Sequence, residues 1–77
     1  KDARLSDRKI TVAGEGDGQI FKLLQLLQDH GYRGFLALEP HLQLAEQRGG
    51  FTGPSGMLNA TKALRDLMNQ AGCTEIF

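Results

Sequence analysis

The chain has 77 residues, of which 40 % are apolar and 23 % are charged, and its nine basic residues balance nine acidic ones. This length allows at most one small domain and excludes a complete eight-stranded βα barrel, which needs about 250 residues. The composition is typical of a folded α/β segment, and the neutral charge disfavours nucleic acid or an anionic membrane as a partner.

The first residues are polar and include the charged side chains Asp2, Arg4, Asp7 and Arg8, whose default interpretation is solvated loop charge. Residues 10–12 form a short β-prone stretch. Residues 14–18 contain three glycines, which predict a turn or an extended loop. Such a loop before a helix can bind phosphate through backbone N–H groups or serve only as a tight turn, and the negative charges of Glu15 and Asp17 oppose phosphate.

Residues 20–29 are predicted to form a helix. Ile20, Leu23, Leu24 and Leu27 recur at the i, i+3, i+4 and i+7 spacing of one helix face. Asp17 or Gly18 suits the start of the helix, and Gly31 suits a left-handed stop at its end.

Residues 35–38, Phe-Leu-Ala-Leu, are predicted to form a strand. Apolar side chains on both faces imply burial on both faces, as in a parallel sheet. Glu39 and then Pro40 follow, so the strand delivers a carboxylate to the rim of the sheet, where α/β barrels carry their chemistry. Glu39 suits a divalent cation or proton transfer, and the structural alternative is a helix cap or an ion pair with arginine. His41 lies two residues further on.

Residues 40–53 are predicted to form a loop, with a possible helical turn in residues 42–47. Pro54 is well placed in the first turn of a second helix, which Gly72 ends. Lys62 and Asp66 are expected to pair on its exposed side. The core stripe of this helix comprises Met57, Ala60, Leu64, Leu67, Met68 and Ala71.

The predicted order is therefore loop, helix, strand, loop, helix, which is the rhythm of βα units. The apolar faces of the strand and of both helices need partners that the 77 residues do not supply. The single cysteine, Cys73, cannot form a disulfide within the chain, and no apolar run is long enough for a membrane span. Both observations favour a cytoplasmic location. The chain starts at Lys1 and not at a methionine, which suggests that it is a piece of a longer protein.

Four motifs resemble, in their order and spacing, the C-terminal quarter of sugar phosphate isomerases/epimerases of the xylose isomerase-like TIM-barrel superfamily, which also contains type IV AP endonucleases. The resemblance covers nearly the whole chain. The motifs are Lys-Asp-Ala-Arg at residues 1–4, Val-Ala-Gly-Glu-Gly-Asp-Gly-Gln-Ile at 12–20, Gly-Tyr-Arg-Gly-Phe-Leu-Ala-Leu-Glu-Pro-His at 31–41 and Gly-Gly-Phe-Thr-Gly-Pro at 49–54.

The resemblance implies that residues 1–77 are the last part of a TIM (β/α)8 barrel with a divalent metal, manganese, magnesium or zinc, at its rim. Glu39 matches the metal-binding glutamate that ends strand eight, and it is also the candidate catalytic acid or base. The other three ligands, a histidine, a glutamate and an aspartate, fall on strands before Lys1. Arg4 lies near the position of an arginine that contacts substrate in ketose epimerases.

The implied parent enzyme interconverts sugars or sugar phosphates by proton transfer through an enediolate. With one ligand of four, the 77-residue chain alone is expected to be inactive and to bind no metal tightly, its partner being the remainder of the barrel. One alternative is a fragment of a type IV AP endonuclease-like phosphodiesterase, but the zinc-binding Asp-Arg-His triplet of that branch is replaced by Asp7-Arg8-Lys9. A non-catalytic interaction fragment is the other alternative.

Overall fold

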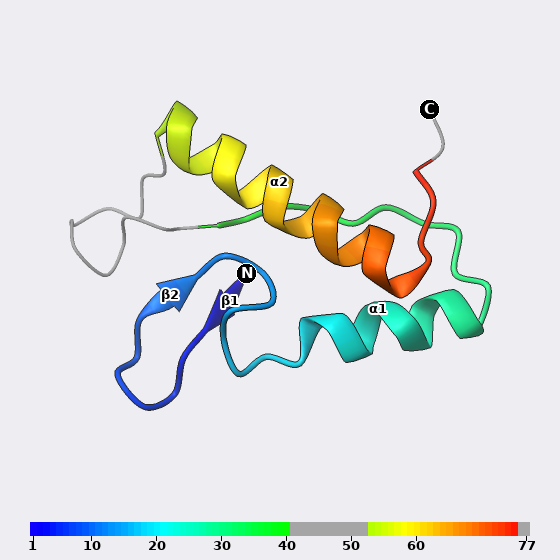
Figure 1. Cartoon of the computed structure of the whole chain (residues 1–77), viewed down its shortest axis with the longest axis horizontal. Helices are drawn as coiled ribbons and strands as arrows, with labels where there is room; N and C mark the ends of the chain where they lie inside the picture. Colours follow the sequence, from blue (N-terminus) through cyan, green and yellow to red (C-terminus); the bar gives the residue numbers. More distant parts are fainter. Residues whose placement is uncertain (41–52, 76–77) are drawn as a thin grey trace.

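The computed structural model describes residues 1–40 and 53–75, and it contains two short strands followed by two helices (Figure 1). The strands are β1, Asp2–Ala3, and β2, Ile10–Thr11, and the helices are α1, Ile20–Asp29, and α2, Pro54–Ala71. His41 and the helical turn expected in residues 42–47 lie outside the described residues. No helix in the described ranges has the length and apolarity that crossing a membrane requires.

β1 and β2 form an antiparallel hairpin in which Asp2 faces Thr11 and Ala3 faces Ile10. The Arg4 N–H donates to the Lys9 carbonyl at 2.9 Å and closes the turn. β2 lies within the stretch that the sequence identified as β-prone. β1 was not anticipated, because a two-residue strand in a polar segment has no periodicity to mark it.

α1 has the predicted bounds, and Leu24 on its apolar face is 3 % exposed. Gly31, with φ +71°, takes the left-handed conformation expected just after the helix. The predicted N-terminal cap is wrong. Gln19, with φ +56°, occupies the cap position, and no side chain caps the helix. Asp17 is unavailable because its carboxylate accepts a hydrogen bond from the Leu5 N–H at 2.6 Å.

α2 begins at Pro54 and is followed by Gly72 with φ +81°, as predicted from these two residues. The expected ion pair joins Lys62 Nζ to Asp66 Oδ2 at 2.7 Å. Ala60 is 3 % exposed and is the most buried member of the predicted stripe. Met57, in the same stripe, is 41 % exposed, so the apolar face of α2 is only partly covered by the rest of the described chain.

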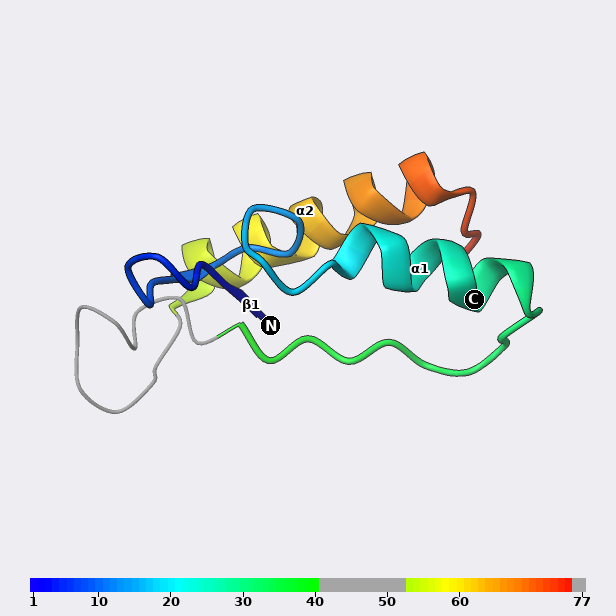
Figure 2. The same cartoon turned by 90° about the horizontal axis from the view of Figure 1, so that it is seen from below.

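The strand predicted at residues 35–38 is not formed. Residues 33–40 run as a drawn-out trace beneath the two helices, and they form no strand pairing with another described segment (Figure 2). The expected burial on both faces is also wrong, since Phe35 is 96 % exposed. A strand requires a neighbour for its backbone groups, and the described part of the chain offers none to this segment.

The helices and this segment form two layers. α1 packs against α2, both helices point the same way, and residues 33–40 return in the opposite direction along one side of the pair (Figures 1 and 2). The described residues thus contain a helix, an extended segment and a second helix in this order. In the described residues, however, the β1–β2 hairpin is the only sheet.

We expect Leu24→Ala to lower the free energy of unfolding by about 2–5 kcal/mol, because it removes a buried side chain at the contact between α1 and the rest of the fold. Thermal denaturation followed by circular dichroism at 222 nm measures the loss. Leu5→Ala is the matched control: Leu5 is 80 % exposed, so its truncation should change stability by less than about 0.5 kcal/mol. Equal effects of the two substitutions would contradict the burial of α1.

Candidate functional site

The most densely bonded group in the described chain is the carboxylate of Asp2, which is 3 % exposed. Its Oδ1 accepts hydrogen bonds from the N–H groups of Ala3 and Gly18, both at 2.9 Å. Its Oδ2 accepts from the N–H groups of Gly14 at 2.9 Å and Gly16 at 3.1 Å. The default interpretation of Asp2 as solvated loop charge is therefore wrong, and we call this arrangement the Asp2 nest.

Glycine is required in this loop because the backbone comes very close to the carboxylate. A Cβ atom added to Gly16 would lie 2.5 Å from both Asp2 Oδ1 and the Ala3 carbonyl oxygen. The Asp17 N–H also donates to that carbonyl at 2.7 Å, which joins the loop to β1 a second time. The glycine loop therefore serves as a tight structural turn, and its N–H groups are directed at a carboxylate of the chain itself.

Burial by itself raises the pKa of the Asp2 carboxyl, because a charge is harder to hold away from water. The hydrogen bonds from Gly18, Gly14, Ala3 and Gly16 favour the ionised form and outweigh that effect, so the net pKa of Asp2 is lowered. A carboxylate held ionised and saturated with donors is a structural anchor. It has no accepting position directed at a ligand.

Glu39, the candidate metal ligand and catalytic residue, lies beside the first residue of the chain. Its Oε1 is 3.9 Å from Lys1 Nζ, and its side chain is 72 % exposed. Lys1 precedes Asp2 directly, so the Asp2 nest fixes the backbone from which the lysine side chain extends. The structure thus brings together the start of the hairpin and the end of the extended segment, which are far apart in sequence.

Arg4, the candidate substrate contact, is engaged within the hairpin. Its Nη2 donates to Asp7 Oδ2 at 3.0 Å, and both side chains are partly exposed. Asp7 also accepts from the Lys9 N–H at 3.1 Å. This backbone hydrogen bond, with smaller contributions from the charges of Arg4 and Lys9, lowers the pKa of Asp7. The two carboxylates at the start of the chain therefore both act within the turn structure.

The described residues do not form a metal centre by themselves. Within residues 1–40 and 53–75, no three His, Cys, Asp or Glu side chains gather closely enough to hold an ion. Asp2 is saturated by N–H donors, and Asp7 is bonded to Arg4 and to the Lys9 N–H. Glu39, beside Lys1, supplies one ligand of the four that the resemblance implies.

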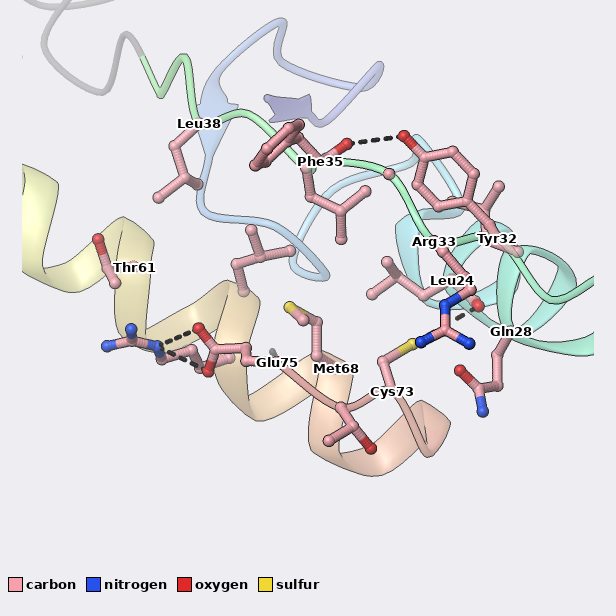
Figure 3. A pocket seen from close by; sticks show the side chains of 16 residues that line it. Leu24, Gln28, Tyr32, Arg33, Phe35, Leu38, Thr61, Met68, Cys73 and Glu75 are labelled. Atoms are coloured by element: carbon pink, nitrogen blue, oxygen red, sulfur yellow. Dashed lines mark hydrogen bonds and ion pairs between the residues drawn. The ribbon is translucent and has the colours of Figure 1, made fainter. Parts of the chain in front are cut away.

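An open pocket of about 610 Å³ is lined by residues of α1, α2, the extended segment and residues 73–75 (Figure 3). Its apolar wall includes Leu24, Leu38 and Met68, and an Arg65–Glu75 ion pair of 3.0 Å stands at its edge. The Cys73 thiol, at 3.8 Å from the Leu24 carbonyl, also faces it. The sequence placed Leu24 and Met68 on the apolar faces of the two helices and Leu38 in the predicted strand, and it assigned none of the lining residues a functional role.

Sequence reasoning missed the role of Asp2, although one signal was present. Glycines at positions 14, 16 and 18 mark a turn whose backbone can approach another group closely, and the N–H groups of such turns can converge on one anion. Three such donors require an acceptor that fits close to the backbone. Asp2 is the acceptor that the hairpin supplies.

Comparison of the chain with models of known protein families, with curated proteins and with solved structures finds no match.

We expect Asp2→Asn to lower the free energy of unfolding by about 2–4 kcal/mol. The amide keeps one oxygen acceptor, but its NH2 group faces two N–H donors and leaves them buried without a partner. Urea denaturation followed by circular dichroism measures the change. Asp66→Asn, which removes an exposed ion pair with Lys62, is the control and should cost less than about 0.5 kcal/mol. If Asp2→Asn unfolded at the same urea concentration as the wild type, the role of Asp2 as a structural anchor would be refuted.

The lowered pKa of Asp2 predicts a specific loss of stability in acid. Because the folded pKa lies below the unfolded value of about 3.9, the stabilisation is complete above that value and is lost as pH falls through the folded pKa. The difference in unfolding free energy between wild type and Asp2→Asn should therefore be constant above about pH 5 and shrink below about pH 4. Urea titrations at several pH values test this. A difference that is independent of pH down to about 2 would contradict it.

Proposed function

We propose that residues 1–77 form the C-terminal portion of a metal-dependent, TIM-barrel sugar or sugar phosphate isomerase/epimerase. In this proposal Glu39 is the carboxylate that the chain contributes to the active site. The observation that carries the proposal is the proximity of Lys1 and Glu39, whose side chains approach to 3.9 Å.

The proximity matters because the motif resemblance places these residues at neighbouring strand ends. Lys1 and Asp2 match a pair that follows strand seven, and Glu39 matches the end of strand eight. Neighbouring parallel strands of a barrel end at the same rim, so their last residues come close in space. A lysine–glutamate contact between these two segments supports that arrangement.

The exposed surface supports the same proposal. Phe35 is 96 % exposed and Leu36 is 39 % exposed in a segment that lies along one side of the helix pair (Figure 2). In a barrel this segment would lie between two other strands, and the helices would form part of the outer layer. Its apolar side chains and backbone groups would then be covered by the rest of the sheet.

The chemistry that this chain supplies is proton transfer by a carboxylate. Glu39 is exposed and stands at the end of its segment, so a substrate carbon carrying an acidic proton can reach its oxygens. Lys1 places a positive charge beside it, where negative charge develops on a substrate oxygen as the proton leaves. A divalent ion, when bound by the complete set of ligands, would polarise the substrate carbonyl.

The type IV AP endonuclease alternative gains no support from the hairpin. In its Asp7-Arg8-Lys9 triplet the aspartate is bonded to the Lys9 N–H and to Arg4, and a protonated lysine stands where a histidine ligand is needed. The non-catalytic alternative is favoured by one observation, the open surface around Phe35, which provides an area for contact with another chain.

In the full-length parent we expect Glu39→Gln to reduce turnover by about 10²–10⁴-fold while the protein stays folded. Glutamine keeps the size of the side chain but removes its charge and its basicity, and a metal ligand would be weakened at the same position. The assay follows sugar epimerisation or isomerisation at saturating manganese, with circular dichroism to confirm folding.

Glu15→Gln is the matched control, because Glu15 is an exposed carboxylate in the glycine loop. It should change turnover by only a few-fold. Retention of near wild-type activity in Glu39→Gln would remove the assignment of Glu39. Absence of a histidine and of strand-end carboxylates upstream of Lys1 in the gene would remove the proposed class.

A further inference from the structure

The extended segment, residues 33–40, leads to a second inference, which concerns self-association and does not depend on the proposed activity. We infer that residues 33–39 of one chain pair antiparallel with residues 33–39 of a second copy, about a two-fold axis at Leu36. Three features lead to this pairing: the backbone edge that is open, the register that charge selects and the positions at which pairing must stop.

The open edge is identified by a side-chain hydrogen bond to the backbone of the segment. The Tyr32 hydroxyl donates to the Phe35 carbonyl at 2.9 Å (Figure 3). In an extended chain the N–H and C=O groups of residues 35 and 37 point to one edge, and those of residues 34, 36 and 38 point to the other. Within the described part of the chain, the backbone groups of Gly34, Leu36 and Leu38 make no hydrogen bond. A second strand would therefore add at this edge.

Charge selects the register at that edge. If Leu36 faces Leu36 of the second copy, Arg33 faces Glu39 at both ends of the pairing, because the two positions lie equally far from Leu36 in sequence. Opposite charges placed directly across an antiparallel pair stabilise it, and like charges destabilise it. Arg33 makes no ion pair with the described residues, and the Glu39 side chain is 72 % exposed, so both can be reached by a second copy.

The same register brings together complementary side chains between the two ion pairs. Phe35, 96 % exposed, faces the small Ala37 of the second copy. Arg33 and Glu39 occupy non-hydrogen-bonded positions, where opposing side chains come closest. A large side chain over a small one fills the surface of the two-stranded ribbon without a clash.

The pairing ends where the chain can no longer supply hydrogen bonds. The next pair would be Tyr32 and Pro40, but the Tyr32 N–H already donates to the Leu27 carbonyl at 2.9 Å, and proline has no N–H. The contact is thus limited to a short ribbon closed by two-fold symmetry, which yields a dimer and not a filament. In a complete barrel the neighbouring strands would pair with this segment. The dimer is therefore expected of the 77-residue chain on its own.

The test is a charge-exchange series on the 77-residue chain, measured by sedimentation equilibrium from micromolar to millimolar concentration. Wild type should be in monomer–dimer equilibrium. Arg33→Glu and Glu39→Arg should each raise the dimer Kd by roughly tenfold, because each places like charges opposite one another at both ends. The double exchange, Arg33→Glu with Glu39→Arg, should restore the wild-type Kd.

A pair of proline variants tests the edge independently of charge. Leu36→Pro removes an N–H from the proposed edge and should abolish the dimer, whereas Ala37→Pro removes one from the opposite edge and should preserve it. A wild-type chain that stays monomeric would overturn the inference and leave the edge to another strand, such as one from a barrel. Open-ended oligomers, no restoration in the double exchange, or equal effects of the two prolines would overturn it as well.

Discussion

The Asp2 carboxylate accepts hydrogen bonds from four backbone N–H groups, and these contacts connect the hairpin to the loop that leads into α1. The position of the helix start follows from this connection, because the loop ends at Gln19 in a left-handed conformation. So does the position of Lys1, which is joined to Asp2 by one peptide bond and extends toward Glu39. The hydrogen bonds of one buried carboxylate therefore connect the hairpin, the loop that enters the first helix and one side of the candidate site.

The elements that the sequence predicted well are those whose signals are local. The apolar spacing from Ile20 to Leu27 and the left-handed Gly31 define α1, and Pro54 with Gly72 defines α2. The segment at residues 35–38 shows the opposite case. Its apolar side chains indicate a strand, but strand formation depends on a second segment that no local pattern specifies. The cap of α1 was also mispredicted, since Asp17 is bonded to Leu5 instead.

The candidate site could be anticipated only in part for the same reason. The position of Glu39 after an apolar segment pointed to a residue that the structure leaves exposed at the end of that segment, whereas its proximity to Lys1 was not anticipated from the sequence. Arg4 forms an ion pair with Asp7, three residues further on. The sequence showed a cluster of charges there but did not indicate which of them would pair. The enzyme proposal and the dimer inference share one physical cause, which is an apolar segment with an open backbone edge. They differ in which strand covers it.

The Asp2 nest also has a consequence for the order in which the chain folds. Its contacts to the loop join residues separated by only 12 to 16 positions, so the entropy lost in closing this part of the chain is small. Loops of about this length close on a submicrosecond timescale, before helices distant in sequence can dock. The packing of α1 on α2, by contrast, must wait for the intervening segment to be brought back along the pair. We therefore expect the hairpin and glycine loop to form first and to fix the start of α1 before Leu24 is buried.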